Sequence, residues 1–597
     1  MNSYRKVILF WIGITALYTS SCVKKTQSQF QILSVEDSHI TFKNNLVATE
    51  DFNPYLYRNF YNGAGVGLGD FNNDGLLDIF FCGNMVSNKL YVNKGSFVFI
   101  DVTEKSNLAT QDVWSSGVSV VDINADGWLD IYVCHAGKPG GFRRHNELFI
   151  NNHDLTFSEQ SKNYGLDFEG LSTHAVFFDM DRDNDLDCYL LTNSIRSVGV
   201  FDLKKGQRKE ADPASEGNKL LKNDNGKFVD ISSQAGIYTS KIGFGLGVTI
   251  GDFNKDGWQD IYVSNDFFER DYLYINQKDG KFLDLAENEI KSMSLGSMGA
   301  DCADINNDGF LDLFVTEMLP QSNDRLKTKA TFEDWNRDQA KVRNGYFFQF
   351  PRNVLQLNNG DNTFSEIGRL AKVEATDWSW GALIFDMDND GLKDIFVANG
   401  IYKDLLDQDY INFVATPENI KAMISTKKGR VIEELMNKMA SSPIPNFVFK
   451  NITGLQFENK AIEWGLGVAS FSNGTAYGDL DNDGDLDLVI NNVNDPAFVY
   501  ENQNEKTHPE NHFLKFILKS NSQNTFSIGA KITIEVPGKM FYIEQMPMRG
   551  FESSVDPRPN LGLGKLRKVD RIIVEWGDGK RDVLTSVKTN QIVTLSH

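Results

Sequence analysis

The sequence predicts an all-β fold: a seven-bladed β-propeller followed by a small C-terminal β domain. Two observations lead to this prediction. The first is an acidic nine-residue pattern that returns seven times, with oxygen-bearing side chains at positions 1, 3, 5 and 9. The second is a β-branched or aromatic run that follows the pattern, as in Ile79–Phe81 and Ile131–Val133, and is typical of a strand. Recurrence at this period indicates an architecture built from one repeated unit.

Each repeat also carries a later signature, an apolar run that ends in Asn and is followed by a turn and a Phe. Leu90–Asn93 with Phe97 and Leu148–Asn151 with Phe157 are examples. These runs indicate hairpins, so each unit offers about four short strands. Seven such units suit a propeller, in which radial closure protects the sheet edges. A straight solenoid is the alternative.

The acidic pattern predicts calcium binding. Calcium takes six to eight oxygen ligands, and the side chains at positions 1, 3, 5 and 9 together with the carbonyl at position 7 would surround one ion. Up to seven calcium ions are expected, in loops 1 to 7, numbered in chain order. The predicted ligands are Asp70, Asn72, Asp74, Leu76 and Asp78; Asp122, Asn124, Asp126, Trp128 and Asp130; Asp179, Asp181, Asp183, Asp185 and Asp187; Asp252, Asn254, Asp256, Trp258 and Asp260; Asp304, Asn306, Asp308, Phe310 and Asp312; Asp386, Asp388, Asp390, Leu392 and Asp394; and Asp479, Asp481, Asp483, Asp485 and Asp487.

Position 6 is Gly in six loops, where it permits a tight backbone. Loop 3 has Asn184 instead, the next most tolerant residue for a left-handed conformation. For any single copy, a solvated Asp/Asn/Gly turn is the alternative. Seven copies in the same phase before the same kind of strand favour calcium.

The net charge agrees with this interpretation. The four side-chain ligand positions of the seven loops hold 24 Asp, more than the whole net charge of −21. Seven divalent ions would leave about −7, an ordinary value for a soluble protein. The acidity therefore does not indicate a basic partner, and no Lys/Arg stripe suggests nucleic acid.

Residues 1–22 have the features of an export signal. Two basic residues precede an apolar run, Val7–Leu17, which is too short to span a bilayer, and small residues then lead to Cys22. The segment resembles a bacterial lipoprotein signal with Cys22 as the lipidated residue, although Thr19 stands where Leu is usual. The residue after Cys22 is Val23 and not the Asp that signals retention in the inner membrane, so retention there is not expected. We expect an outer-membrane lipoprotein at the cell surface or periplasmic face, with plain secretion as the alternative.

The mature chain divides into a repeat region, residues 23–511, and a C-terminal region, 512–597. Three wide spacings between loops indicate insertions near 194–217, 316–353 and 401–446. The last contains apolar residues at helical spacing: Ile432, Leu435, Met436 and Met439. The middle one is rich in Arg and aromatic residues, for which ligand binding and packing over the propeller are equal alternatives. We expect the helix of the last insertion to pack. Residues 513–597 alternate apolar and polar in several runs, which indicates a separate β domain.

No catalytic motif emerges. Zinc signatures and the Gly-x-Ser-x-Gly elbow are absent from the sequence. His135, His145 and His174 could converge, but scattered surface histidines are the favoured interpretation. The cysteines of the mature chain give no disulfide framework, and buried free thiols are expected, although Cys82 and Cys134 occupy equivalent places in consecutive repeats.

These features resemble the FG-GAP/VCBS repeat family, to which the Gly-rich approach Gly63–Asp70 is similar. The C-terminal region resembles the ASPIC/UnbV domain, and Gln349–Gly360 fits the combined, cartilage acidic protein-like architecture. The stretches that carry the second resemblance are Ser527–Ile534, Arg549–Ser554, Leu561–Gly564 and Val569–Trp576. The resemblance implies integrin-like calcium loops at the seven matched positions and nothing catalytic.

Function is expected to reside outside the repeats. The favoured hypothesis is a calcium-binding module, anchored to the membrane through a lipid on Cys22, that serves adhesion or scaffolding by binding a glycan or protein. The alternative is a carbohydrate-active, lyase-like enzyme with a site on the propeller face. Fold analogy does not decide between the two hypotheses.

Overall fold

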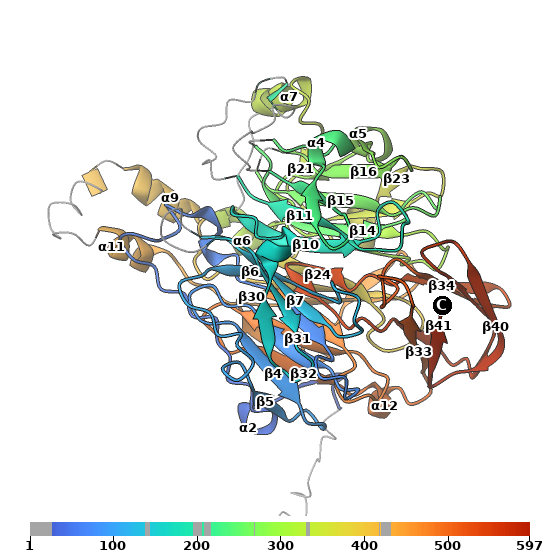
Figure 1. Cartoon of the computed structure of the whole chain (residues 1–597). Helices are drawn as coiled ribbons and strands as arrows, with labels where there is room; N and C mark the ends of the chain where they lie inside the picture. Colours follow the sequence, from blue (N-terminus) through green and yellow to red (C-terminus); the bar gives the residue numbers. More distant parts are fainter. Residues whose placement is uncertain are drawn as a thin grey trace, which may run out of the picture.

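The computed structural model describes residues 27–597 apart from 138–143, 195–203, 205, 208–216, 241, 268, 330–334, 417 and 420–430. Seven sheets, each built on four antiparallel strands, follow one another along the described chain (Figure 1) and are called blades 1 to 7; the sheet of blade 1 has two further strands. From the inner to the outer strand, blade 1 consists of β2 (Val66–Gly69), β3 (Asp78–Phe81), β4 (Lys89–Asn93) and β5 (Phe99–Asp101); blade 2 of β6 (Ser115–Val121), β7 (Asp130–His135), β8 (Glu147–Asn151) and β9 (Phe157–Glu159); and blade 3 of β10 (Ser172–Phe178), β11 (Asp187–Thr192), β12 (Lys219–Asn223) and β13 (Phe228–Asp230). Blade 4 consists of β14 (Gly245–Gly251), β15 (Asp260–Asn265), β16 (Tyr272–Asn276) and β17 (Phe282–Asp284), and blade 5 of β19 (Ala300–Ala303), β20 (Asp312–Val315), β22 (Val354–Asn358) and β23 (Phe364–Glu366). Blade 6 consists of β24 (Ser379–Phe385), β25 (Asp394–Asn399), β27 (Phe447–Asn451) and β28 (Phe457–Asn459), and blade 7 of β30 (Ser472–Gly478), β31 (Asp487–Asn492), β32 (Phe498–Asn502) and β1 (Phe30–Ile32).

The sheets form a closed ring. The inner strand of each blade contacts the inner strand of the next, and β30 of blade 7 returns to β2 of blade 1. Blade 7 takes its outermost strand from the N-terminal end, because β1 pairs with β32 and places Phe30 opposite Asn502. A solenoid would leave its end sheets apart, so the predicted propeller fold is confirmed. The predicted strands after the loops and the predicted hairpins are also present.

The inner strands are buried throughout, with the apolar residues of neighbouring blades packed between the sheets. Small residues allow these strands to approach each other. A Cβ added to Gly299, the residue before β19, would lie 2.2 Å from the carbonyl oxygen of Trp380 in β24. The ring therefore requires glycine at this contact.

Two of the three insertions are largely described. The middle one holds α6 (Asn323–Lys329), α7 (Trp335–Arg343) and β21 (Gln349–Phe350), which pairs with β18 (Met293–Ser294). The last holds α9 (Gln408–Ala415), α11 (Val431–Lys438) and β26 (Ile444–Pro445), which pairs with β29 (Ala469–Ser470). Most of the insertion at 194–217 lies outside the described residues. The remaining short helices are α2 (Val35–Ser38), η1 (Arg58–Tyr61), α3 (Ser161–Tyr164), α4 (Ser232–Ala235), α5 (Ala286–Glu289), α8 (Gly368–Ala371) and α12 (Asn504–Thr507). No helix among the described residues is long and apolar enough to cross a membrane.

Helix α6 of the middle insertion contacts α9 of the last one. In Figure 1, α9 and α11 lie on the left and α7 lies at the top. Arg325 and Lys329 of α6 both pair with Asp404, at 3.1 and 3.2 Å. Leu435 and Met436 of α11 are buried, as the expectation of a packing helix requires.

The C-terminal region forms two further sheets on the side opposite α9 and α11, on the right in Figure 1. One consists of β38 (Asn560–Gly564), β33 (His512–Lys519) and β41 (Gln591–Ser596), and the other of β35 (Lys539–Glu544), β34 (Lys531–Val536), β39 (Lys568–Glu575) and β40 (Arg581–Lys588). They enclose a core of their own that includes Phe516, Ile532 and Trp576. Between β35 and β38 the chain leaves this domain and joins the sheet of blade 1 through β36 (Met548–Arg549) and β37 (Ser553–Ser554).

Candidate metal centre

The seven acidic loops all connect the first and second strands of their blades, so they lie at one face of the ring. Loop 1 shows the shared geometry. Asp70 accepts hydrogen bonds from the backbone N–H groups of Asp74 (3.0 Å) and Gly75 (2.8 Å), which curls the loop around its carboxylate. Gly75 has a φ of 90°, as predicted for position 6.

Two left-handed residues make this tight turn possible. Asn184 of loop 3 adopts a φ of 70° and so takes the conformation of Gly at position 6, as expected. Position 4 is also left-handed in every loop, which the sequence did not reveal because residues as different as Ala125, Arg182 and Lys255 stand there. A left-handed backbone is strained at residues other than Gly, and the turn tolerates this strain because the surrounding carboxylates fix the backbone N–H groups.

The closing Asp of each loop is buried and binds the backbone on both sides. Asp78 accepts from the N–H of Phe71 (3.1 Å) with one oxygen and from the N–H of Asn93 (2.9 Å) with the other. Burial raises the pKa of this carboxyl to about 8. Burial likewise raises the pKa values of the equivalent Asp130, Asp187 and Asp312 to about 8. A group of this kind ionises readily only when a positive charge lies beside it.

The donor set fits a hard divalent cation. In loops 3, 6 and 7, three carboxylates converge so that one oxygen of each lies within 4.8 Å of the others. The three sets are Asp179, Asp181 and Asp187; Asp386, Asp388 and Asp394; and Asp479, Asp481 and Asp483. One carboxylate oxygen each of Asp179, Asp181 and Asp479 is buried without a hydrogen-bond partner. Unsatisfied buried oxygens in an all-oxygen cage match the ligand preference of calcium.

In loops 1, 2, 4 and 5, position 3 is Asn instead of Asp. The side-chain amide of Asn72 donates to Asp74 at 2.9 Å, and the other three loops repeat this bond. Among the described residues, no triple carboxylate set of the kind in loops 3, 6 and 7 is found in these four loops. The converging sets hold positions 1, 3 and 9 in loops 3 and 6 and positions 1, 3 and 5 in loop 7. The ligand role of the predicted residues in all seven loops, including the position 7 carbonyls, stays a prediction.

A buried Asn links the loop of its own blade to the neighbouring loop in six of the seven blades, all except blade 3. The side-chain amide of Asn93, at the end of β4, donates to the carbonyl of Leu77 in its own loop (3.1 Å) and to that of Leu480 in loop 7 (2.8 Å). The amides that make both bonds in later blades belong to Asn151, Asn276, Asn358, Asn451 and Asn502. The sequence showed this Asn as a repeat signature but not its role between blades.

The C-terminal domain rests on this loop face. Lys515 of β33 lies 2.9 Å from the carboxylate of Asp479, with both side chains almost fully buried. Lys531 of β34 pairs with Asp252 in the same way. Lysines of the C-terminal domain therefore form ion pairs with the position 1 carboxylates of loops 7 and 4.

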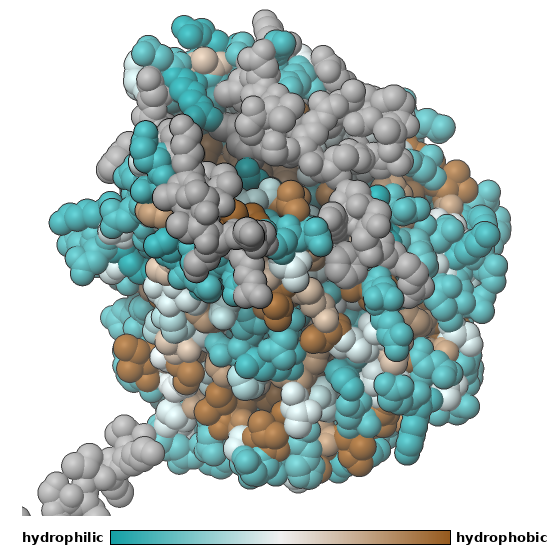
Figure 2. Space-filling model, turned by 90° about the vertical axis from the view of Figure 1, so that its left-hand side faces the viewer, coloured by the Kyte–Doolittle hydropathy of each residue, from teal (hydrophilic) through white to brown (hydrophobic). Residues whose placement is uncertain are grey.

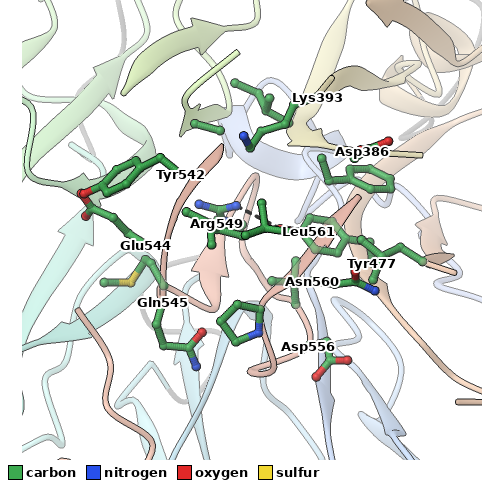
Figure 3. A pocket seen from close by; sticks show the side chains of 18 of the residues that line it. Asp386, Lys393, Tyr477, Tyr542, Glu544, Gln545, Arg549, Asp556, Asn560 and Leu561 are labelled. Carbon is green, nitrogen blue, oxygen red and sulfur yellow. Dashed lines mark hydrogen bonds between the residues drawn. The ribbon is translucent and has the colours of Figure 1, made fainter. Parts of the chain in front are cut away.

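The hairpin of β36 and β37 contacts the inner strands β2, β6, β10, β14 and β30, so it fills the propeller axis. Figure 3 shows Arg549 of this hairpin in the axial pocket. Arg549 is buried, with its guanidinium 3.3 Å from Asp301 of β19 and 2.9 Å from the hydroxyl of Tyr477 in β30. Ser554 pairs with Gly67 of β2 and donates to the carbonyl of Val118 in β6 at 3.0 Å. These contacts join the hairpin to blades 1, 2, 5 and 7. The sequence singled out Arg549–Ser554 only through its resemblance.

The hollows at this face differ widely in size. The axial one, beside Arg549 and Lys393, measures about 40 Å³, which accommodates a water molecule but not a sugar ring. A groove of about 820 Å³ runs between loops 1 and 2 and the end of β33, lined by Asp126, Lys519 and Phe526 among others. Its size falls in the range of small-molecule sites.

The histidines do not share one site. His135 is buried and lies 3.0 Å from Glu147, whereas His174 is buried 3.3 Å from the carbonyl of Val118. The expectation of scattered surface histidines is wrong for these two, because strands β7 and β10 place them inside the ring. His145 pairs through its backbone with Glu169. The cysteines among the described residues are buried free thiols, as predicted: Cys82, Cys134, Cys188 and Cys302.

Two family models match parts of this chain. A model of FG-GAP-like repeats matches residues 47–133, 252–315 and 346–397, and a model described as ASPIC and UnbV matches 520–597. The chain contains FG-GAP-like repeats and a C-terminal ASPIC and UnbV domain. The matched segments include loops 1, 2, 4, 5 and 6 in the propeller and most of the domain that covers them.

Relatives share these parts at low identity. Cartilage acidic protein 1 of Mus musculus is 23% identical over 382 residues, which are 56% of this chain and 57% of the relative. Integrin alpha-3 of Mus musculus is 34% identical over 112 residues, 16% of this chain and 10% of the integrin. The Xenopus tropicalis cartilage acidic protein 1 is matched over only 36% of its length, so the chain spans a third to just over half of these cartilage proteins. Among solved structures, the Vibrio cholerae biofilm matrix protein Bap1 matches with a TM-score of 0.36 and 11% identity, over 87% of this chain and 99% of that one.

Proposed function

We propose that this protein is a calcium-stabilised binding propeller without catalytic activity, exported and held at a bacterial outer membrane by a lipid on Cys22. When bound, calcium would neutralise the acidic loops and so fix the face on which the C-terminal domain rests. The residues that would hold it are the position 1, 3, 5 and 9 side chains. Ligand recognition, by contrast, is assigned to the opposite face.

The observation that carries the proposal is the difference between the two faces. At the loop face the Arg549 hairpin fills the axis and leaves a hollow of only about 40 Å³, and the groove of about 820 Å³ there is lined by residues of the proposed calcium loops, such as Asp70 and Asp126. The middle insertion instead presents large aromatic side chains to solvent: Trp335 is 72% exposed, Phe348 45% and Phe350 41%. Figure 2 shows the side of the molecule on which α9 and α11 lie, where hydrophobic groups lie scattered among hydrophilic ones.

The middle insertion combines packing with exposure. Tyr346 is buried, whereas Phe348 and Phe350 project outward on either side of Gln349 in β21. The guanidinium of Arg352 lies 4.8 Å over the Phe350 ring. Exposed aromatic rings with a stacked Arg are suited to a sugar ring or an apolar protein side chain. We therefore place the glycan or protein ligand on the middle insertion.

The test is a binding screen of the full chain against glycan arrays and extracellular matrix proteins. A ligand should be retained by the wild-type protein and lost in a Phe348→Ala/Phe350→Ala variant. Leu370→Ala, which truncates a residue that is 72% exposed in α8, is the matched control and should bind normally. Cleavage of any polysaccharide in the same screen would contradict the non-catalytic proposal and support the lyase-like alternative.

A further inference from the structure

The seven loops differ in a way that follows a second position in each repeat. Where position 3 is Asn, the residue before the bridging Asn of the hairpin is apolar: Val92, Ile150, Ile275 and Leu357. Where position 3 is Asp, in loops 3, 6 and 7, that residue is charged: Lys222, Lys450 and Glu501. The extra carboxylate and the charged neighbour therefore occur together within this one chain.

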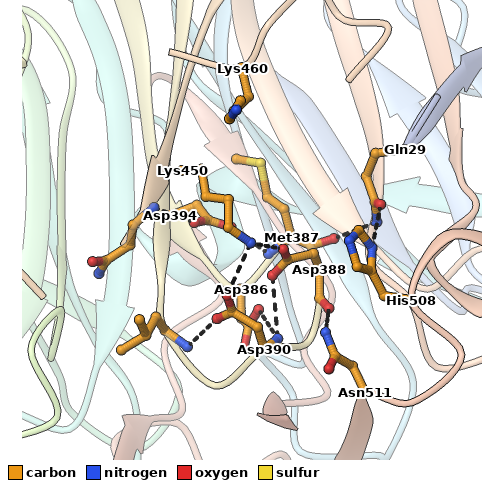
Figure 4. A network of polar contacts seen from close by, with 12 residues as sticks. Gln29, Asp386, Met387, Asp388, Asp390, Asp394, Lys450, Lys460, His508 and Asn511 are labelled. Atoms are coloured by element: carbon orange, nitrogen blue, oxygen red, sulfur yellow. Dashed lines mark hydrogen bonds and ion pairs between the residues drawn. The ribbon is translucent and has the colours of Figure 1, made fainter. Parts of the chain in front are cut away.

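In blade 6 the lysine lies at the carboxylate cage (Figure 4). The ammonium of Lys450 contacts the carboxylate of Asp388 at position 3 and lies 3.0 Å from that of Asp390 at position 5. Asp388 is also one of the three carboxylates that converge in this loop. A calcium ion that used Asp388 would have to share it with this ammonium or displace it.

Blade 3 repeats the arrangement. Lys222 contacts the carboxylate of Asp181 and lies 3.8 Å from that of Asp183. The second carboxylate oxygen of Asp181 is buried without a hydrogen-bond partner, as is one oxygen of Asp179. These two oxygens point to a cation in the loop in addition to the lysine.

Among the described residues, no lysine pairs with position 3 in the other loops, although lysines reach other cage carboxylates there: Lys278 lies 3.2 Å from Asp256 in loop 4, and Lys515 lies 2.9 Å from Asp479 in loop 7. In loop 1, position 3 is the neutral Asn72, whose amide donates to Asp74, so this loop has one ligand carboxylate fewer than loops 3 and 6. In blade 7 the equivalent residue is Glu501, which adds negative charge and pairs with Lys506 at 3.3 Å. Loop 7 thus has the extra Asp without a lysine from its own hairpin, whereas loops 3 and 6 have both.

We propose that Lys222 and Lys450 are tethered cations that compete with calcium for loops 3 and 6. This inference rests on the proposed calcium binding and divides the loops into classes. A positive charge a few ångströms from a divalent ion opposes its binding, and a fourth carboxylate favours it. Loops 3 and 6 therefore fill at higher calcium concentrations than they would without these lysines, and they respond to changes in calcium outside the cell.

The experiment is a calcium titration of the full chain against a chromophoric chelator. Lys450→Met should tighten one site by about tenfold or more, since it removes a unit charge next to the ion. Lys460→Met is the matched control in the same blade. Lys460 pairs with Glu458 and Glu463, at 3.3 and 2.9 Å, and Figure 4 shows it apart from the cage, so this variant should titrate as wild type does.

Two further variants keep the result independent of any single substitution. Lys222→Met should tighten a second site in the same way, and Glu501→Lys should weaken one site by placing an ammonium beside Asp481. Unchanged affinities in all three variants, in a wild-type protein that binds calcium, would overturn the inference and leave calcium binding standing. A wild-type protein that binds no calcium would overturn both the inference and the calcium part of the proposed function.

Discussion

The side-chain amide of Asn93 donates to the carbonyl of Leu480, 2.8 Å away and 387 residues later in the chain. This bond joins loop 1 to loop 7, so it closes the ring at the face that carries the acidic loops. Together with the pairing of β1 and β32 it ties the first blade to the last at two places. The propeller is therefore held closed by polar bonds as well as by packing.

Replacing Asn93 with Leu should destabilise the ring. The change leaves the buried carbonyls of Leu77 and Leu480 without this donor, which costs about 2 kcal/mol of unfolding free energy. Thermal unfolding monitored by calorimetry measures the effect. Asn152→Leu is the control: Asn152 is exposed and follows the bridging Asn151 of blade 2, and its replacement should change stability by less than about 0.5 kcal/mol. Equal effects of both variants would rule out a special role for the bridging Asn.

Replacing Arg549 with Met should release the axial hairpin. Asp301 would remain buried without its cation, which costs about 3 to 5 kcal/mol. The variant should unfold at a lower temperature, and added Asp301→Asn should recover part of the loss because it removes the unpaired charge. Arg567→Met, at an exposed site of the C-terminal domain, serves as control. A melting temperature for Arg549→Met equal to that of the control would contradict the role of the hairpin.

The metal-free protein should lose stability as the pH rises. Burial raises the pKa of Asp78, Asp130, Asp187 and Asp312 to about 8 in the folded state, from an ordinary value of 3.8. The stability that these carboxyls contribute to the fold while protonated is fully present below pH 4 and is lost as the pH climbs through 8, because the unfolded chain releases these protons more easily. Melting of a metal-free preparation should thus occur several degrees lower at pH 8.5 than at pH 6. A higher melting temperature at pH 8.5 would show that these carboxyls are not protonated in the metal-free fold.

Local patterns in the sequence predicted the repeated parts of this structure well. The strands after the loops, the hairpins and the helix with Leu435 depend on residues that are close in the chain, and periodicity reveals such elements. The left-handed Asn184 followed from the repeat alone.

Contacts between distant residues could not be predicted. Three contacts join segments that are hundreds of residues apart. They are the strand pairing of Phe30 with Asn502, the hydrogen bond from Asn93 to Leu480 and the ion pair of Arg549 with Asp301. Nothing in the local composition of residues 545–558 indicates that they leave their own domain and enter the ring. The burial of His135 and His174 was missed for the same reason.

Removal of calcium tests the central claim most directly. At a calcium concentration ten times the dissociation constant, each site adds roughly 1.4 kcal/mol, so seven sites add about 10 kcal/mol, comparable to the stability of a whole domain. Calorimetry of the full chain, with calcium and after exhaustive chelation, should show a large fall in melting temperature that restored calcium reverses. An unchanged melting temperature in the metal-free protein would contradict the claim that calcium stabilises this propeller.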